Sequence, residues 1–327
     1  MTPTPNLQGS AGTSVDTTFA LGIDLGGSSI KAVAVTPAGV LLGETNVPFD
    51  VNEQLDWAHR IQRIVHGMES KQGRPAQALG ISAPGLAAAD ARSIAFMPGR
   101  LQGLERLDWT EFLNPGRGSA TGIEHSAFVP VLNDGHAALL GEAWLGAARG
   151  FRNVIMLTLG TGVGGAAMVD GRLLRGALGR AGHFGHMSLD VEGPRDVCEM
   201  PGSLEVMIGN CTLERRSGGR FKTTHELVKA HLNGDEDATE VWLKSVRALG
   251  CAISSLMNVL DPEAVIIGGG ITRCGPALFD PLEGFVRDTE WKVGAPARIL
   301  RAQLGELAGA YGAAGNALCT AGIRPAS

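Results

Sequence analysis

The sequence lacks the features of several large classes of protein. Its five cysteines are an odd number and lie far apart, so they do not have the pattern of a disulfide framework, and we expect a cytoplasmic protein. The net charge of −5 comes from interspersed acids and bases, which gives no basic surface for nucleic acid. No apolar run approaches the roughly 18 residues that a membrane span needs. We therefore expect neither a nucleic-acid partner nor a membrane.

Glycine, by contrast, is abundant and clustered. It makes up 47 of the 327 residues, about 14%, against a usual share of ~7%. Clustered glycines mark backbone turns or places where a backbone approaches something closely. The chain is also 44% hydrophobic, which with its length allows one large domain or two smaller ones. Residues 1–18 are rich in Pro, Thr, Ser and Gly and are expected to be a disordered tail rather than a secretory signal.

Two parts of the chain have the same order of expected elements. In the first, strands 19–23 and 29–36 are joined by a glycine turn and followed by strand 40–45. In the second, strand 154–159 meets the turn GTGVGG and a further strand, and Asp170-Gly171 then predicts a hairpin. This similarity indicates a weak internal repeat. The other expected elements are helices 53–69, 239–260 and 306–320, a helix from Asp134 to about 148, a helix after the glycines 268–270, a loop-rich segment 86–127, and strands 78–82, 129–132, 264–267 and 298–303.

The glycine turns suit the binding of phosphate. GTGVGG, residues 160–165, matches the glycine pattern of dinucleotide-binding proteins, but that fingerprint needs a helix directly after it, and a hairpin is expected here. A glycine turn between two strands can bring backbone N–H groups against phosphate oxygens, and Ser28, Ser29 and Thr161 can add hydroxyl donors. Asp24, at the end of the strand before the first turn, can hold Mg²⁺ through water. With a third glycine cluster at 268–270, the pattern favours a clamp for a magnesium nucleotide over three ordinary turns.

Two further stretches carry residue types suited to catalysis or binding. Asn133 and Asp134 follow an expected strand and begin an expected helix, so either can be a helix N-cap, and Asp134 can also be a general base in a cleft. His183 and His186 lie three residues apart in a glycine-rich loop. Such a pair is more often structural, but it can also contact a metal or a substrate.

Five stretches together resemble the ROK family of sugar kinases and related repressors, within the actin-like and hexokinase superfamily. They are GIDLGGSSIK, ISAPG, VLNDGHAALLGE, LGTGVGGAAMVDGRLLRGALGRAGHFGH and VIIGGGI, and a helix of small residues, LAGAYGAAGNAL, closes the chain. The resemblance runs from about Phe19 to about Leu318. It implies an α/β fold of two actin-like, ribonuclease-H-like domains around a deep cleft. The smaller domain would be 19–132 with the C-terminal helix of about 306–323, and the larger domain, 133–305, would carry most of the ATP site.

The resemblance also implies roles for individual residues. Asp134 matches the catalytic aspartate of the family. The residues implied for sugar binding are Gly85, Asn133, His183, His186 and Glu205. Those implied for ATP binding are Asp24, Gly26, Gly27, Ser28, Lys31, Gly160, Thr161, Gly162, Gly164, Gly268, Gly269 and Gly270, with Mg²⁺ held by Asp24 through water. We therefore expect ATP and Mg²⁺ as cofactors and, from the family, a homodimer.

The loop after His186 departs from the family pattern. The family's zinc loop is His, nine residues, then Cys-x-Cys-Gly-x-x-Gly-Cys-x-Glu. Counting from His186, Asp196 and Ser203 replace two of the three cysteines, and only Cys198 remains. A closed structural zinc site needs four Cys or His ligands. We therefore expect no structural zinc.

Two departures concern the sugar. His183 stands where kinases of the family usually carry Glu, which changes the donors and acceptors offered to a sugar. The family's sugar-contacting Asn after the turn Pro98-Gly99 has no counterpart, and Arg100 is the nearest candidate to replace it. The identity of the sugar is therefore left open by the sequence.

The sequence thus predicts an ATP-dependent kinase, similar to glucokinase, that phosphorylates a hydroxyl of a hexose or hexose derivative with Asp134 as general base. The alternative is a sugar-binding, catalytically silent regulator of the ROK type that lacks a DNA-binding domain. Repressors of the family carry a winged helix-turn-helix before the first motif, and the tail here is neither helical nor basic in pattern. The retention of Asp24, Asp134 and both glycine turns favours the kinase.

Overall fold

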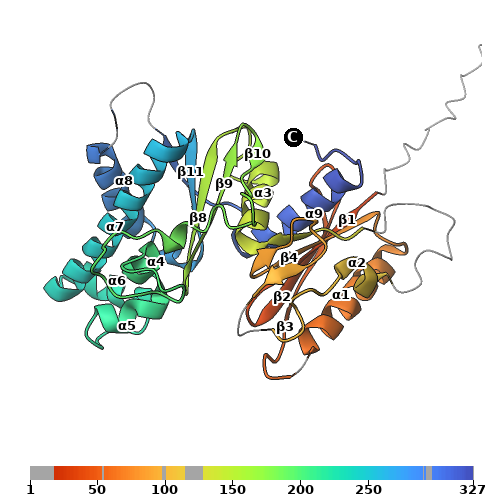
Figure 1. The fold of residues 1–327 in the computed structure, drawn as a ribbon, viewed down its shortest axis with the longest axis horizontal. Helices are drawn as coiled ribbons and strands as arrows, with labels where there is room; N and C mark the ends of the chain where they lie inside the picture. The colour runs from red at the N-terminus through yellow and green to blue at the C-terminus, as the bar shows by residue number, and fades with distance from the viewer. Residues whose placement is uncertain are drawn as a thin grey trace, which may run out of the picture.

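The structure is a computed structural model that describes residues 18–53, 55–97, 101–114, 128–289, 291 and 297–326. Residues 1–17 of the expected tail and Arg100 lie outside the described residues. The part described has an α/β fold with two five-stranded sheets side by side, each with helices against it (Figure 1). The expected α/β class is confirmed.

The first sheet is built around the first glycine turn. Its strands are β1 (Ala20–Leu25), β2 (Ser29–Val35), β3 (Leu41–Pro48), β4 (Ala78–Ala83) and β7 (Val131–Asn133), in the spatial order β3-β2-β1-β4-β7. The first three strands are antiparallel, whereas β4 runs parallel to β1 and β7 runs parallel to β4. The sheet therefore starts as a meander and continues as a parallel sheet.

The alternation of residues along β1 decides which helix covers each face of this sheet. Leu21, Ile23 and Leu25 lie in the core shared with α1 (Asp56–Gln72). Ala20 and Gly22 face α9 (Ala308–Thr320) on the other side. Successive side chains of a strand point to opposite faces. Asp24 therefore points to the face of the sheet that α9 covers.

The second sheet repeats the topology of the first. Its strands are β8 (Val154–Leu159), β9 (Val163–Val169), β10 (Arg172–Leu173), β11 (Ala264–Gly268) and β12 (Arg298–Arg301), in the order β10-β9-β8-β11-β12. The first three are again antiparallel and the other two parallel. α7 (Glu236–Leu260) and α8 (Pro276–Thr289) share a core with one face, and α3 (Asp134–Leu145) packs on the other. The internal repeat predicted from the two glycine turns is confirmed.

Shorter elements connect the two sheets and their helices. They are α2 (Trp109–Leu113), α4 (Leu204–Ile208), α5 (Leu213–Arg216), α6 (Thr224–Leu232), the two-stranded sheet of β5 (Leu86–Ala87) and β6 (Ile94–Phe96), and the 3₁₀ turns η1 (Phe184–His186), η2 (Asn210–Thr212), η3 (Gly270–Cys274) and η4 (Gly305–Leu307). The helix expected after Gly268–Gly270 is present as α8 (Pro276–Thr289), but the 3₁₀ turn η3 lies between the glycines and that helix. The reason is that Gly269 and Gly275 have positive φ angles, 85° and 57°, which an α-helix does not contain. No helix in the described ranges is long and apolar enough to cross a membrane.

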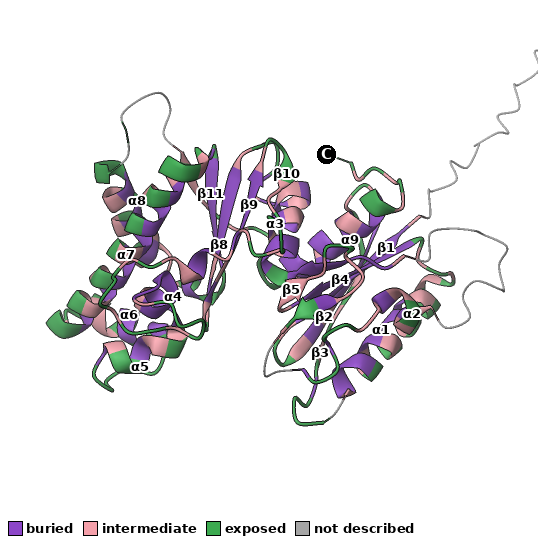
Figure 2. Ribbon diagram, viewed as in Figure 1, coloured by how far each residue is buried: buried purple, intermediate pink, exposed green. Residues whose placement is uncertain are grey.

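The central strands of both sheets and the inward faces of the helices are buried, whereas the edge strand β3 and the outward faces of α1, α6 and α8 are largely exposed (Figure 2). At the centre, α3 crosses α9 at very short range. A Cβ added to Gly312 would lie 1.7 Å from the carbonyl oxygen of Ala137, and one added to Gly141 would lie 2.3 Å from that of Ala308. Glycine is therefore required at both positions, because no side chain fits between the two helices.

Glu142, near the end of α3, binds the segment that follows β12 of the second sheet. Its side chain is fully buried. Its carboxylate accepts hydrogen bonds from the backbone N–H groups of Ala147, Gln303 and Leu304, at 2.7 to 3.1 Å. A buried carboxylate with several N–H donors is stable only while those donors stay in place. Glu142 thus joins the two segments of chain that run between the sheets.

Replacing Gly312 with Ala tests the crossing of α3 and α9. The added methyl group would force the helices apart, and overpacking of this kind costs about 1–3 kcal/mol. We expect the free energy of unfolding of Gly312→Ala, measured by urea denaturation, to fall by about 2 kcal/mol or more.

The matched control is Gly67→Ala in α1. A Cβ at Gly67 meets no atom within 4 Å beyond its chain neighbours and the backbone of its own helix. Helix propensity then predicts a gain of up to ~1 kcal/mol. Equal stability of the two variants would contradict the close crossing.

Candidate active site

The carboxyl ends of three parallel strands bring the first site residues together. Asp24 lies near the end of β1, Ser82 is its register partner on β4, and Asn133 ends β7. The Ser82 hydroxyl donates a hydrogen bond to Asp24 Oδ1 at 2.6 Å. Ser82 is fully buried and was not among the residues predicted for the site. Its only signal was its place in ISAPG, at the end of an expected strand.

The negative charge of an ionised Asp24 is only partly balanced by its neighbours. Burial is the main cause that raises its pKa, from 3.8 to about 6, and the nearby carboxylate of Asp134 raises it further. The hydrogen bond from Ser82 and the charge of Lys31 act in the opposite direction. Lys31 is also engaged by Glu306, with 3.7 Å between Nζ and Oε2. The site therefore holds an acid whose ionised form is poorly stabilised.

Asp134 is the first residue of α3, and it lies between the two sheets. β7 of the first sheet leads directly into it. A Cβ added to the next residue, Gly135, would lie 2.7 Å from the carbonyl oxygen of Gly165 on β9 of the second sheet. The start of α3 is thus in contact with the strand that follows the second glycine turn.

The Asp134 carboxylate is accessible but poorly solvated. Its side chain is exposed, and Oδ1 accepts the N–H of Gly135 at 2.8 Å. Desolvation by the surrounding protein raises its pKa, while the Gly135 N–H and the nearby His183 lower it. An accessible carboxylate with a raised pKa is suited to take up a proton from a bound ligand.

The side chain of Asn133 forms hydrogen bonds that fix the backbone around Asp134. Its Oδ1 accepts the N–H groups of Gly135 and His136, at 3.0 and 3.3 Å, so it is the N-cap of α3. Its Nδ2 donates to the carbonyl oxygen of Gly85 at 2.9 Å. Gly85 has a φ of +98°, and an added Cβ would lie 2.6 Å from the carbonyl oxygen of Phe96. Both predicted residues therefore shape the backbone around Asp134.

The first glycine turn, between β1 and β2, is open at its tip. The Gly26 N–H donates to the carbonyl oxygen of Ser29 at 2.9 Å and closes the turn. Gly27 and Ser28 are exposed. Their backbone and hydroxyl donors are accessible to a ligand.

The second glycine turn, between β8 and β9, is packed from behind by Glu205. Glu205 Oε2 accepts the Val163 N–H at 3.0 Å. A Cβ added to Gly162 would lie 2.3 Å from that oxygen, and one added to Gly164 would lie 2.4 Å from Thr158 Oγ1. A Cβ added to Gly160 would have no neighbouring atom within 4 Å, and Thr161 is exposed. The inner glycines are thus needed for packing, while the outer part of the turn is accessible.

A cavity of about 600 Å³ lies beside this turn. Asn210, which lines it, donates its N–H to the carbonyl oxygen of Gly160 at 3.0 Å. Gly270 lines the cavity as well. The preceding residue, Gly269, packs closely on β8, because an added Cβ would lie 2.3 Å from the carbonyl oxygen of Leu159. The other lining residues include Thr223, Thr224, Val228, Lys229, Leu232, Asn233, Ile271 and Arg273. The third glycine cluster therefore borders this cavity through Gly270, and the second turn is joined to its lining by the hydrogen bond between Asn210 and Gly160. The volume is typical for small-molecule sites.

Another hollow, more open and of about 670 Å³, lies over α1 beside Asp56 and His59. It includes none of the residues predicted for the site.

His183 carries an unsatisfied polar atom into the site. Its Nε2 is buried and has no hydrogen-bond partner within the described part of the chain. Burial lowers its pKa, and Asp134 opposes that shift, so the ring is neutral near pH 7. The loop before it is held by His136, a residue the sequence analysis missed, whose Nε2 lies 3.0 Å from the carbonyl oxygen of Ala181. A buried nitrogen without a partner is the kind of group that a ligand satisfies.

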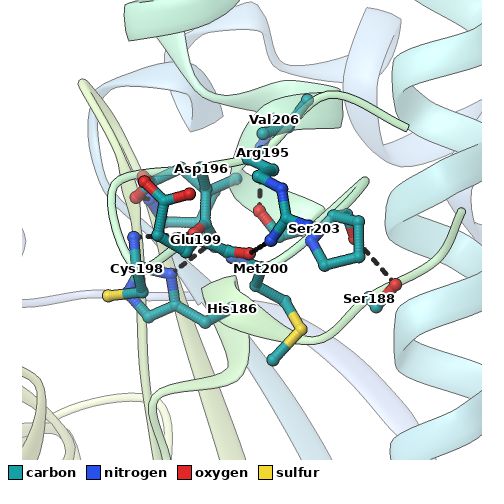
Figure 3. A network of polar contacts seen from close by, with 12 residues as sticks. His186, Ser188, Arg195, Asp196, Cys198, Glu199, Met200, Ser203 and Val206 are labelled. Atoms are coloured by element: carbon teal, nitrogen blue, oxygen red, sulfur yellow. Dashed lines mark hydrogen bonds and ion pairs between the residues drawn. The ribbon is translucent and has the colours of Figure 1, made fainter. Parts of the chain in front are cut away.

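His186, by contrast, has partners at both ring nitrogens. Nδ1 lies 2.8 Å from Asp196 Oδ2, and Nε2 lies 3.6 Å from Cys198 Sγ (Figure 3). Burial and the carboxylates of Asp196 and Glu205 raise the pKa of the Cys198 thiol. The ligand atoms of these three residues, His186, Asp196 and Cys198, all lie within 4.8 Å of one another.

Comparison with known proteins identifies the family of the chain. A family model described as the ROK family matches residues 20–319. The chain belongs to the ROK family. The resemblance inferred from the five stretches is confirmed, and with it the actin-like fold that the family implies.

Three relatives are similar over most of the chain. The glucokinase of Thermotoga maritima is 31% identical over 286 residues, which cover 82% of this chain and 87% of that protein. The kanosamine kinase of Amycolatopsis mediterranei is 31% identical over 306 residues, covering 91% and 95%. The structure of a ROK family glucokinase from Streptomyces griseus in complex with glucose and AMPPNP is 28% identical, with a TM-score of 0.72, and covers 91% of this chain and 99% of that one.

Removing the charge of Asp24 should stabilise the protein in a pH-dependent way. Because the pKa of this carboxyl is raised from 3.8 to about 6 on folding, the folded state binds its proton more tightly than the unfolded state. Stability is then lost as the pH rises from 3.8 through about 6. Measured by thermal or urea unfolding, Asp24→Asn should be more stable than the wild type by on the order of 1–2 kcal/mol at pH 8, since the side chain is partly exposed, and by less at pH 4.5.

Asp288→Asn, at an exposed position of α8, controls for the loss of one negative charge. A stability difference for Asp24→Asn that does not change with pH would contradict the raised pKa.

Proposed function

We propose that this ROK-family chain is an ATP-dependent sugar kinase, a phosphotransferase that acts on a hydroxyl of a hexose or hexose derivative. The observation that carries the proposal is the placement of Asp134. An accessible carboxylate with a raised pKa begins the helix that touches both sheets, beside Asp24 and the unsatisfied nitrogen of His183. The relatives named glucokinase and kanosamine kinase support the same reaction class.

In the proposed reaction, Asp134 accepts the proton of the sugar hydroxyl while that oxygen attacks the γ-phosphorus atom of ATP. A bond forms between the sugar oxygen and phosphorus, the bond to the β–γ bridging oxygen breaks, and ADP leaves with its electron pair. Phosphoryl transfer of this kind depends mainly on positioning and on neutralisation of charge. A positioned base contributes about 10²–10⁴-fold, and a pKa raised toward the working pH makes a carboxylate a better base.

The nucleotide would lie along the second sheet. The accessible parts of both turns, Gly27-Ser28 and Gly160-Thr161, would supply N–H and hydroxyl donors to the phosphates. The cavity beside Gly270 would hold the adenosine. The AMPPNP in the Streptomyces griseus glucokinase supports a nucleotide ligand for this fold.

Asp24 fits a magnesium ion held through water. It is an oxygen ligand, it is partly exposed, and its negative charge is incompletely offset by Ser82 and Lys31. Bound magnesium would neutralise charge on the phosphate oxygens. The bound ion would also lower the pKa of Asp24, because an opposite charge favours the ionised form.

The sugar would lie against Asp134 and His183. A neutral His183 offers Nε2 either as donor or as acceptor, where a carboxylate could only accept. Glu205 would contact the sugar from α4, Asn133 and Gly85 would shape the backbone of the sugar site, and His186 would act through its loop. We also propose that the protein is a cytoplasmic homodimer. Its two domains would meet near residues 132 and 306.

The test is sugar-dependent release of ADP by the wild-type protein with Mg-ATP. The panel contains glucose, mannose, fructose, glucosamine, kanosamine, N-acetylglucosamine and N-acetylmannosamine. We expect turnover with at least one of these sugars and none when magnesium is left out. A protein that binds a sugar but shows no binding of Mg-ATP would contradict the kinase and favour the catalytically silent regulator.

A further inference from the structure

The carboxylate of Asp196 is the centre of the loop that follows His186. Its side chain is only 1% exposed, although it lies in a surface loop. Oδ2 lies 2.8 Å from His186 Nδ1, and Oδ1 accepts the N–H groups of Cys198 and Met200 at 2.8 and 3.0 Å. The Ser203 hydroxyl is a fourth donor. Figure 3 shows these side chains gathered around Asp196.

These donors satisfy the carboxylate without a metal. An ionised carboxylate has two oxygens with about four acceptor positions, and four donors meet them here. A closed zinc site would need four Cys or His ligands, whereas the family positions hold His186, Asp196, Cys198 and Ser203. The ligand atoms of His186, Asp196 and Cys198 lie within 4.8 Å of one another, but the fourth position is a serine hydroxyl, which is not a zinc ligand of such sites. The residues present therefore do not fit a structural zinc.

The loop nevertheless keeps a compact turn. The Asp196 N–H donates to the carbonyl oxygen of Met200, and the Glu199 N–H donates to that of Asp196, both at 3.0 Å. Glu199 has a φ of +63° at the position where the family carries glycine. An unfavourable φ of this kind persists only where the surrounding contacts fix the backbone.

The same carboxylate ties together the two elements that present the proposed sugar contacts. His186 is the last residue of η1, which His183 precedes directly. Ser203 is the N-cap of α4 and accepts the Val206 N–H at 3.4 Å, and Glu205 lies in the first turn of that helix. Asp196 thus links η1 to α4 through one hydrogen bond to each.

We propose that Asp196 is a positioning residue that takes the place of a metal ion: its buried carboxylate holds η1 and α4 at the spacing in which His183 and Glu205 meet the sugar. This inference rests on the proposed function for its kinetic readout, but not for its metal and stability readouts. Metal-free folding of the loop follows directly from it.

The experiment compares four full-length proteins: the wild type, Asp196→Ala, the control Glu192→Ala at an exposed acid of the same loop, and the double variant Asp196→Cys/Ser203→Cys. Each is analysed for zinc content and for melting temperature with and without EDTA. The wild type and the control should hold no stoichiometric zinc and melt at the same temperature with and without EDTA. Asp196→Ala should melt at a lower temperature, because its four donors lose their acceptor.

The kinetic readout separates positioning from general stability. Asp196→Ala should raise the KM for the sugar by about tenfold or more, the usual cost of losing a residue that orients a ligand contact. The KM for ATP should stay at the wild-type value. If Asp196→Ala does not fold, Asp196→Asn, which keeps Oδ1 for the two N–H groups, gives the same comparison.

The double cysteine variant provides the rescue. With His186 and Cys198 it completes four His and Cys ligands, so it should bind about one zinc per chain. Its sugar KM should return toward the wild-type value with zinc and rise again with EDTA. A wild type that carries about one zinc per chain, or an Asp196→Ala variant with the sugar KM of Glu192→Ala, would overturn the inference. If no sugar is phosphorylated, the proposed function fails, while zinc content and the effect of EDTA still decide the role of Asp196.

Discussion

The crossing of α3 and α9 is the contact on which the rest of the structure depends. α9 lies directly on the first sheet, since a Cβ at Gly22 or Gly80 would be 1.9 or 2.1 Å from a carbonyl oxygen of that helix. α3 lies as closely on α9. The N-terminal turn of α9 also meets Asp24, 2.7 Å from where a Cβ of Gly309 would be. One set of backbone contacts therefore places Asp24 and the beginning of α3 relative to each other.

This placement sets two carboxylates in a region with little positive charge. Burial raises the pKa of both Asp24 and Asp134. The shift is opposed at Asp24 by the Ser82 hydroxyl and Lys31, and at Asp134 by the Gly135 N–H, Asn133 and two nearby histidines. Such a site costs stability in the free protein, as functional sites commonly do. A cation that accompanies a bound nucleotide would offset the charge of Asp24. The proton taken from a substrate would neutralise Asp134.

The sequence predicted those parts of the fold that local pattern determines. The strand, glycine turn and strand of each half have strong local signals, so both hairpins and the repeated topology could be predicted, and Asp134 could be placed at the start of a helix. Ser82 and His136 could not be found in this way, because their partners, Asp24 and Ala181, are 58 and 45 residues away. The short helices α4, α5 and α6 were missed because none has a long apolar period, although the capping box of Thr223 and Glu226 is a local signal for the start of α6. Asp196 could be compared with a cysteine of the family pattern, but its place at the centre of the loop depends on four donors that meet only in the folded chain.

The most direct test of the account is a single-turnover measurement of phosphoryl transfer in Asp134→Asn, with the sugar identified as substrate bound first and Mg-ATP then mixed in. Asn keeps the shape of the side chain and can still accept the Gly135 N–H, but it cannot take a proton from the sugar. We predict that both substrates bind with near wild-type affinity and that transfer slows by about 10²-fold or more. Transfer at the wild-type rate would contradict the role of Asp134 as the base, and with it the central claim that the crossing of α3 and α9 places the catalytic group.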